Sequence, residues 1–311
     1  MVAMQDSSIV IDCRNVTKTY RGQHRPALDG VTFQVKQGQR VGLMGANGSG
    51  KSTLLKLILN FLRPDTGCIR VFQREDLEDA RRFLGYVSEH QVGLENFTPR
   101  ELFEFAARMY ALPSQQAGER RDALLELSEL REVADDLVEG FSKGMVQRLQ
   151  IALAIYHDPP ILLLDEPLSG LDPQGQAEVR AMLSQINGRT ILLATHQLDE
   201  IEKFCDSGIL LHQGRVRAIL DLKAQKQEIY QITVGSQIRP HLGQFEAWQP
   251  RIIQEESDWI TLQFQATPEI FQKFLNRCQQ QNIPVHRIRS RGILEDLYLR
   301  YVQGNTETST T

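Results

Sequence analysis

Cysteine is scarce in this sequence, and its four cysteines are scattered. They form no Cys-x-x-Cys pair, and no cluster of histidines accompanies them. Paired cysteines with nearby histidines mark structural zinc sites, and a regular even set marks a disulfide-stabilised secreted domain. The pattern argues against both and is typical of a protein of the reducing cytoplasm. The positions are Cys13, Cys68, Cys205 and Cys278.

Long hydrophobic runs are also missing. A transmembrane helix needs roughly 18–20 consecutive apolar residues, and the longest stretches here, such as Ile161–Leu164, suit only a buried strand. The N-terminal residues lack the basic start and apolar run of a signal peptide. If the protein serves a membrane, we expect it to act from the inner surface through a separate membrane-spanning partner.

The sequence also lacks a strong net charge of either sign. The 35 Lys and Arg residues nearly balance the 39 Asp and Glu residues, for a net charge of −4. This balance gives no reason to expect nucleic acid or anionic lipid as a partner of the whole chain. The 311 residues are enough for one large domain and one smaller domain, each with its own core.

Up to about Ile219, short apolar runs alternate with longer helical patterns, which is typical of an α/β sheet protein. A mostly helical block interrupts this alternation, and Thr98–Glu101 has the composition of a helix start, with a hydroxyl, a proline and a carboxylate. We expect an α/β domain over residues 1–220 with a helical subdomain at about residues 97–157. Its expected elements include strands at Gln39–Met44, Ile161–Asp165 and Thr190–Thr195, a helix at Ser52–Leu62, and a hairpin of Ile209–Leu211 and Val216–Ile219.

The composition becomes rich in glutamine after Leu220, and no glycine-rich turn follows. We expect a small α+β domain at residues 221–303, with a regulatory or dimerisation role, and a disordered tail at residues 304–311. If residues 239–248 are helical, the order is βαββαβ with a last helix at residues 293–302, which is a ferredoxin-like arrangement. The expected strands are Glu228–Val234, Arg251–Glu255, Trp259–Gln265 and Pro284–Ile288, and a helix starts at Pro268 after the cap Thr267.

A glycine-rich segment follows the strand that ends at Met44, and a helix follows the segment. It matches G-x-x-x-x-G-K-[ST] without a break. Glycines let the backbone curl so that its N–H groups face a phosphate, the lysine reaches the terminal phosphates, and the hydroxyl binds Mg²⁺. The segment predicts an ATP-binding loop of Gly45, Ala46, Asn47, Gly48, Ser49, Gly50, Lys51 and Ser52, followed by Thr53.

Two carboxylates end the apolar strand at residues 161–165. Asp165 is placed to join Ser52 in holding Mg²⁺, and Glu166 to polarise a water that attacks the terminal phosphate. Four apolar residues and two acids are a weak signal alone. Its weight comes from the motifs on either side.

These flanking motifs are specific. Phe141–Met145 precedes an alanine-rich helix about 20 residues before the strand, Ser169–Asp172 follows the strand, and His196 ends the next one. With this order of motifs, residues 9–219 resemble the ATP-binding cassette of ABC transporters. GTPases and small-molecule kinases with a phosphate loop lack the order, and no N-K-x-D motif for guanine is present.

The resemblance implies a role for each matching position. Tyr20 matches the aromatic residue that stacks on adenine, although a tyrosine there could equally pack in the ordinary way. Glu166 matches the catalytic carboxylate, and His196 the switch histidine beside the γ-phosphate, where a lone histidine would otherwise be an ordinary polar residue. Two segments match motifs that operate between two copies of the cassette. They are the signature, Ser142, Lys143, Gly144 and Met145, which touches the partner's γ-phosphate, and the dimer loop, Ser169, Gly170, Leu171 and Asp172.

Two positions depart from the usual family pattern. The signature commonly reads L-S-G-G-Q, whereas Lys143 and Met145 replace a glycine and a glutamine here. The glutamine expected after residues 84–87 is replaced by Glu89, a position that contacts Mg²⁺ or water. Both changes, and the C-terminal Leu294–Tyr298, are similar to the ABC-2 exporter type, a group that includes the copper-site maturation ATPase of nitrous oxide reductase.

The sequence therefore predicts a homodimeric ATPase that energises export through a multi-span membrane permease. A cassette ATPase acting on ribosomes or DNA is one alternative, but such proteins carry two cassettes or long coiled coils, and this chain has neither. A module that binds ATP without turnover is another, but Lys51, Asp165, Glu166 and His196 are all present. The transported substrate cannot be read from the sequence.

Overall fold

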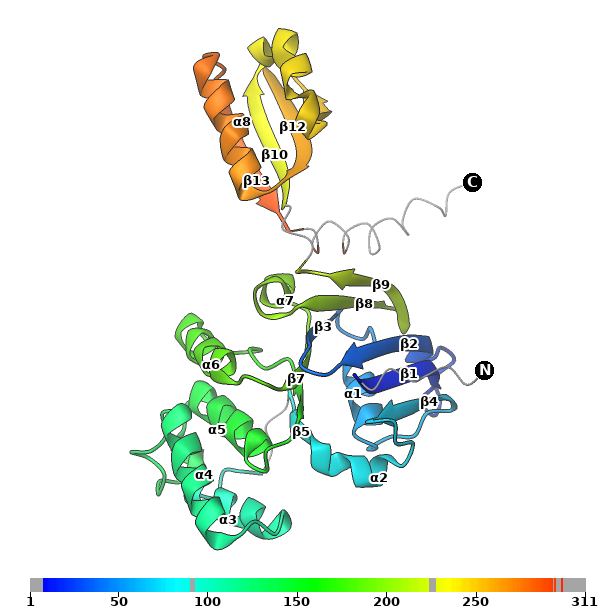
Figure 1. The fold of residues 1–311 in the computed structure, drawn as a ribbon, viewed down its shortest axis with the longest axis vertical. Coiled ribbons are helices and arrows are strands. Elements are labelled where there is room, and N and C mark those ends of the chain that lie inside the picture. The colour runs from blue at the N-terminus through cyan, green and yellow to red at the C-terminus, as the bar shows by residue number, and fades with distance from the viewer. Residues whose placement is uncertain (1–7, 90–92, 224–227, 293, 295–297, 299–311) are drawn as a thin grey trace. The chain divides into compact units, whose positions relative to one another are not determined.

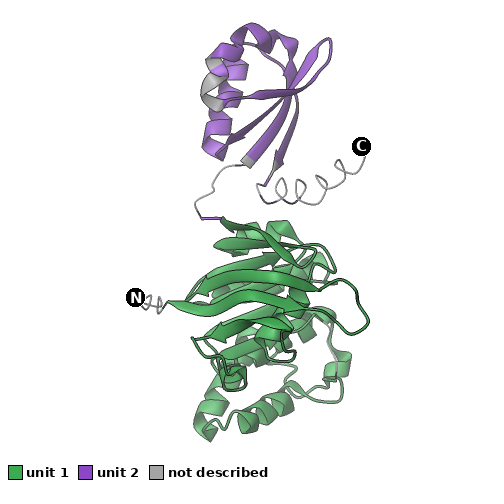
Figure 2. Cartoon of the chain, turned by 90° about the vertical axis from the view of Figure 1, so that its right-hand side faces the viewer, with its two compact units in different colours: residues 1–220 green, residues 221–311 purple. Residues whose placement is uncertain are grey.

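The structure is a computed structural model that describes residues 8–89, 93–223, 228–292, 294 and 298. The chain divides into two compact units, residues 1–220 and residues 221–311 (Figure 2). Within the described ranges no helix is both long enough and apolar enough to cross a bilayer.

A six-stranded sheet forms the centre of the first unit, and the pairs from β5 to β8 are parallel (Figure 1). Parallel strands are covered on both faces, which explains their nearly continuous apolar sequences. All five residues of β6 are buried, and β6 and β7 have the predicted bounds. In order across the sheet, the strands are β5 Leu84–Val87, β6 Ile161–Asp165, β7 Thr190–Thr195, β3 Arg40–Met44, β8 Ser207–His212 and β9 Arg215–Asp221.

A second, antiparallel sheet of order β2-β1-β4 packs in the same core. Its strands are β1 Ile9–Lys18, β2 Leu28–Lys36 and β4 Thr66–Val71. Helix α1, Lys51–Ile58, contributes Leu54, Leu55, Leu57 and Ile58 to this core, all fully buried. The helix is shorter than the predicted Ser52–Leu62. It ends early because Asn60 adopts a left-handed φ of 57° and the Phe61 N–H turns back to the Lys56 carbonyl at 2.8 Å.

Helices make up the block between β5 and β6. Helix α3 begins with the predicted capping box: the Glu101 N–H donates to Thr98 Oγ1 at 3.2 Å, and the Thr98 N–H donates to Glu101 Oε2 at 2.9 Å. Tyr156 ties the block together, since its hydroxyl donates to the Ala117 carbonyl at 2.9 Å and its ring meets Phe103 edge-on at 5.0 Å. The helices are α3 Pro99–Met109, α4 Ser114–Leu127, η2 Val138–Gly140 and α5 Lys143–Ile155.

Four further helical elements complete the first unit. Helices α2, Leu77–Ala80, and η1, Arg81–Phe83, precede β5, and α6, Pro173–Gln185, and α7, Leu198–Phe204, flank β7 in the chain. Helix α6 starts at the cap Asp172, whose Oδ1 accepts from the Gly175 N–H at 3.0 Å. Helices α5 and α6 lie side by side (Figure 1).

The second unit is an antiparallel sheet of order β11-β12-β10-β13 with helices on one face. All four strands and the helix after Thr267 confirm the sequence prediction, and residues 239–248 lie in a 3-10 helix that contains Pro240. The predicted helix at residues 293–302, apart from Leu294 and Tyr298, and the tail at residues 304–311 lie outside the described residues. The elements are β10 Glu228–Gly235, η3 Ser236–Trp248, β11 Arg251–Glu255, β12 Trp259–Ala266, α8 Pro268–Gln280 and β13 Val285–Arg291.

Candidate nucleotide site

The glycine-rich loop joins β3 to α1 in a conformation that requires glycine. Gly48 and Gly50 have left-handed φ angles of 79° and 109°. A Cβ atom at Gly45 would lie 2.3 Å from the Leu211 carbonyl oxygen, and one at Gly50 would lie 2.5 Å from the Ala27 carbonyl oxygen. The loop therefore runs in close contact with neighbouring backbone, at positions where a side chain would not fit.

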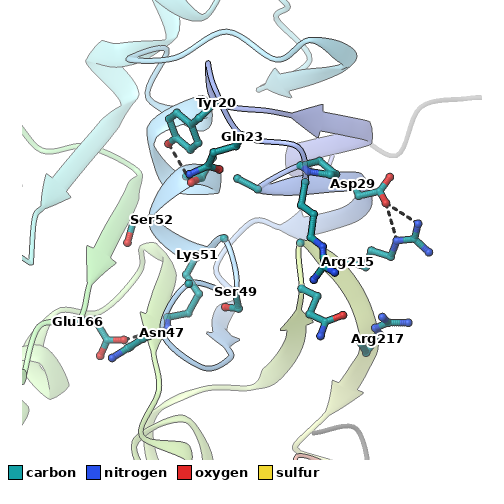
Figure 3. Close-up of a pocket in the computed structure, with 18 of the residues that line it drawn as sticks. Tyr20, Gln23, Asp29, Asn47, Ser49, Lys51, Ser52, Glu166, Arg215 and Arg217 are labelled. Carbon is teal, nitrogen blue, oxygen red and sulfur yellow. Dashed lines mark hydrogen bonds and ion pairs between the residues drawn. The ribbon is translucent and has the colours of Figure 1, made fainter. Parts of the chain in front are cut away.

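A cavity of about 860 Å³ surrounds the loop (Figure 3). Figure 3 shows Tyr20 and Glu166 well apart, with Lys51 and Ser52 between them. The volume is in the range of small-molecule and cofactor sites. Among the predicted site residues its lining includes Tyr20, Asn47, Gly48, Ser49, Gly50, Lys51, Ser52, Thr53, Glu89 and Glu166.

Lys51 is buried at the bottom of this cavity. Its Nζ donates to the Gly45 carbonyl at 2.8 Å and lies 3.2 Å from Glu166 Oε1. The side chain of Lys51 is 6% exposed and that of Glu166 is 5% exposed. A buried ammonium needs a partner of opposite charge, and the Glu166 carboxylate supplies it here. A phosphate group entering the cavity would compete with Glu166 for the same ammonium.

Glu166 is constrained in both its backbone and its side chain. Its N–H donates to the Ala194 carbonyl at 2.8 Å, and its backbone has a left-handed φ of 48°. Its Oε2 lies 2.9 Å from His196 Nδ1. A left-handed φ is uncommon for a residue other than glycine and often marks a functional position. Lys51 and His196 therefore fix the carboxylate in one orientation.

Asp165, the last residue of β6, directly precedes Glu166 and contacts Ser52 of the phosphate loop. Ser52 Oγ donates to Asp165 Oδ1 at 3.2 Å. Burial raises the pKa of Asp165, with the nearby Glu89 and Glu166 carboxylates adding to the rise and the Ser52 hydrogen bond opposing it. Two hard oxygen donors thus stand together next to the phosphate loop.

Tyr20 and Glu89, two further predicted site residues, also line this cavity. The Tyr20 hydroxyl lies 3.1 Å from Thr53 Oγ1, so the ring is tied to the first turn of α1. Glu89 lines the cavity but is exposed to solvent. The structure therefore brings Tyr20, Glu89 and Glu166 to one cavity from three distant parts of the sequence.

The predicted signature residues do not line this cavity. Ser142 caps α5, because its Oγ accepts from the Met145 N–H at 3.2 Å, and Gly144 faces Gly175 of α6. The predicted dimer loop joins Glu166 to α6: the Ser169 N–H donates to the Glu166 carbonyl at 3.0 Å, and Asp172 caps the helix. Lys143 and Met145 lie in the first turn of α5, and Ala46 and Leu171 likewise lie outside the cavity lining.

Sequence reasoning missed the opposite wall of the cavity. Gln213, Gly214, Arg215 and Arg217 come from the β8–β9 hairpin, the loop before β2 adds Gln23 and Arg25, and β2 itself adds Asp29. The Gly214 N–H donates to the Ser49 carbonyl at 3.0 Å, which pins the hairpin to the phosphate loop, and Arg215 Nη2 lies 2.6 Å from Asp29 Oδ2. No motif marks these residues, since only the fold brings them together.

A glycine-rich phosphate loop between a parallel strand and a helix, with an acidic strand end beside it, defines a phosphate-loop nucleotide-binding protein. The family model described as "ABC transporter" matches residues 28–169. An uncharacterized ABC transporter ATP-binding protein, YxlF of Bacillus subtilis, is 30% identical over 301 residues, covering 94% of this chain and 99% of that protein. The chain belongs to the ATP-binding proteins of ABC transporters and is an ABC ATPase.

Other relatives carry a more specific name. Two Nod factor export ATP-binding proteins I from Rhizobium meliloti are 36% identical over 240 residues and 32% identical over 313 residues. The first alignment covers 72% of this chain and 70% of the relative, and the second covers 94% and 88%. Their name assigns export to those proteins.

Solved structures of ATP-binding cassettes are similar to this chain. The structure of an ATP-binding subunit of an ABC transporter is 34% identical with a TM-score of 0.63, covering 70% of this chain and 92% of that one. The ATP-binding cassette MJ0796, solved as a dimer in a post-hydrolysis state with ADP and Pi, is 28% identical with a TM-score of 0.62, covering 68% and 98%.

Proposed function

We propose that this protein is the ATP-hydrolysing subunit of an exporter and drives a separate multi-span permease by closing as a homodimer around ATP. The observation that carries the proposal is the orientation of Glu166 between Lys51 and His196 in the cavity of the phosphate loop. The Nod factor export relatives support the direction of transport.

The residues that line the cavity, together with His196 beside it, divide the work of hydrolysis. The phosphate loop binds the β- and γ-phosphates through backbone N–H groups and Lys51, which then leaves Glu166. The freed carboxylate takes a proton from water, the water oxygen bonds to the γ-phosphorus, and the bond from that phosphorus to the β-phosphate oxygen breaks. His196 keeps Glu166 oriented, and the products are ADP and inorganic phosphate.

The residues beside the loop suit Mg²⁺. Ser52 Oγ and Asp165 Oδ1 are hard oxygen donors 3.2 Å apart, of the kind Mg²⁺ prefers. Glu89 lines the same cavity and supplies a third oxygen donor, either to the ion or to water. When bound, the ion neutralises phosphate charge. Its charge would also lower the pKa of Asp165 from its raised value, because a cation favours the carboxylate.

Two copies share each ATP site in this proposal. Ser142, Lys143, Gly144 and Met145 stand at the N-terminal end of α5 and do not line the cavity of their own chain. N–H groups at a helix start favour an anion, and the dimeric MJ0796 structure is a precedent for paired cassettes. The loop Ser169–Asp172 links each Glu166 to α6 and so relays closure. Tyr20 supplies a ring for adenine.

The proposed permease couples ATP hydrolysis to transport, and it holds the protein on the inner face of the cell membrane. Membership of the ABC-2 exporter type, suggested by Lys143, Met145 and Glu89, fits the exporter names of the relatives. Affinity purification of the tagged chain from its own membranes should recover a multi-span membrane protein in constant ratio. Its presence should raise the ATPase rate several-fold. If no membrane protein is recovered and the ATPase responds to ribosomes or DNA, the transport assignment is wrong.

For the second unit we propose a ferredoxin-like fold and a role in pairing or regulating the cassettes. Its βαββαβ order and antiparallel sheet β11-β12-β10-β13 support the fold. Its core of Ile232, Phe245, Leu262 and Phe274 is separate from that of the first unit.

Deletion from Leu222 onward should leave ATP affinity unchanged, because every cavity residue lies before it. The same deletion should weaken pairing of the nucleotide-free cassettes by about tenfold or more, since a loss of only about 1.4 kcal/mol of interface free energy is tenfold. Equilibrium titration of ATP and analytical ultracentrifugation measure the two effects. A truncated cassette that pairs and couples as well as the full chain would refute the role.

A further inference from the structure

A second cavity, of about 190 Å³, lies next to the catalytic segment in the first unit. Pro167 and Leu168, the two residues after Glu166, form one wall. Leu183 of α6, Leu193 of β7 and Phe204 of α7 complete an apolar lining, with Arg180, Ser184, Glu200 and Lys203 as its polar members. A cavity of similar size with apolar walls can bind benzene in a protein interior.

Glu200 is the unusual member of this lining. It is 6% exposed, and its Oε1 is buried without a hydrogen-bond partner in the described part of the structure. The lack of solvation raises its pKa to about 7, against opposing effects of Arg180 and Thr195 and with small additions from Glu166 and Asp199. A buried acceptor without a partner costs free energy, and a leucine would pack here without that cost.

The charges around the cavity restrict the ligand. Arg180 and Lys203 stand among the lining residues, so a cationic ligand is disfavoured, and the Glu200 carboxylate disfavours an anionic one. The apolar walls leave room for a compact body of a few carbon atoms. A neutral apolar molecule with one hydrogen-bond donor satisfies all three conditions.

We propose that this cavity is a binding site for a small neutral hydroxyl compound of about the size of phenol, whose hydroxyl donates to Glu200 Oε1. Such a ligand pairs the buried acceptor and fills the space behind Pro167 and Leu168. Because these residues directly follow Glu166, an occupied cavity holds the catalytic segment in the arrangement where Glu166 contacts Lys51 and His196. Occupancy therefore slows hydrolysis. This effect on turnover rests on the proposed role of Glu166, whereas binding does not.

Phenol and toluene are matched probes, because they share shape but only phenol carries the donor. Calorimetric titration of the full-length protein without nucleotide should give a phenol dissociation constant on the order of 1 mM. Toluene should bind at least about tenfold more weakly, since it leaves the carboxyl unpaired. Equal affinities, or no phenol binding up to about 10 mM, a concentration tenfold above the expected constant, would overturn the proposal.

Two substitutions locate the site. Glu200→Leu removes the acceptor and Leu183→Phe fills the space, so each should weaken phenol binding about tenfold or more. Glu202→Leu, on the exposed side of the same helix, is the matched control and should not change it. Thermal melting and ATP titration verify that each variant is folded. Phenol binding that survives both cavity substitutions places the ligand elsewhere and overturns the proposal.

Turnover is measured separately with saturating ATP. Phenol should lower the maximal rate about two- to fivefold with little change in KM, because the cavity contacts the catalytic segment and not the phosphate loop. The Leu183→Phe variant should be insensitive to phenol. If phenol binds but turnover is unaffected, the site stands and the link to Glu166 is wrong. If Glu166→Gln leaves turnover intact, the proposed function fails independently of phenol binding.

Discussion

Glu166→Gln should lower the rate of ATP hydrolysis by about 10²–10⁴-fold, because glutamine keeps the shape but cannot accept the proton of water. ATP should still bind, since Lys51 and the loop backbone are unchanged and the ammonium no longer has a carboxylate competing for it. An ATP-bound dimer should therefore accumulate. Steady-state turnover and size-exclusion chromatography with ATP and Mg²⁺ measure the two effects.

Glu132→Gln makes the same chemical change at an exposed residue of the helical block between β5 and β6. It should leave both measurements at the wild-type level. A Glu166→Gln protein that hydrolyses ATP at the wild-type rate and stays monomeric with ATP would contradict the catalytic assignment. Loss of ATP binding in this variant would instead show that Glu166 supports the fold of the loop. The melting temperature distinguishes a folding defect from a catalytic one.

Lys51→Ala should reduce ATP affinity by on the order of 10²-fold or more, because the charge-assisted contacts of its ammonium with the phosphates are lost. The change also removes the ion-pair partner of the buried Glu166, so some loss of thermal stability is expected. Lys51→Gln, which retains a donor, should be more stable and equally defective for ATP. Fluorescence titration with labelled ATP and melting curves give both quantities.

Lys56→Ala is the matched control, since Lys56 is an exposed lysine on the same helix. It should keep wild-type affinity and stability. If Lys51→Ala and Lys51→Gln bind ATP as tightly as Lys56→Ala does, the loop Gly45–Ser52 is not the phosphate site. The fold would then have to place the nucleotide elsewhere in the 860 Å³ cavity.

Local patterns were enough to predict the strands that carry the site. The apolar run of β6 and the capping box of α3 depend on neighbouring residues, and the structure confirms both. The early end of α1 depends on the conformation of Asn60, for which the sequence has no proline or glycine signal.

The motifs predicted that Ser52 and Asp165 lie together, but other interactions between distant residues could not be predicted. The ion pair of Lys51 with Glu166 joins residues far apart in the sequence and exists only because β3 and β6 lie in one sheet. Arg215 reaches the nucleotide cavity through the hairpin contact between Gly214 and Ser49. Nothing in the sequence distinguishes Glu200 from a carboxylate on the exposed face of a helix, yet the packing of α7 against β7 buries it.

The central claim is that each ATP site combines the phosphate loop of one copy with the signature of the other, and mixing two inactive variants tests it. Lys51→Ala removes the loop function. Gly144→Asp places a carboxylate where the partner's γ-phosphate is proposed to bind. A Cβ there meets Gly175 Cα at 3.5 Å and Glu178 Oε2 at 4.0 Å, so thermal melting must verify that this variant is folded.

Each variant alone should be inactive, whereas an equimolar mixture contains mixed dimers with one complete site. Half of the dimers are mixed and each has one working site of two, so the mixture should recover about a quarter of the wild-type ATPase rate. The rate should rise and then plateau as the copies exchange. A mixture that shows no more activity than the two variants measured separately, although both are folded, would contradict shared ATP sites.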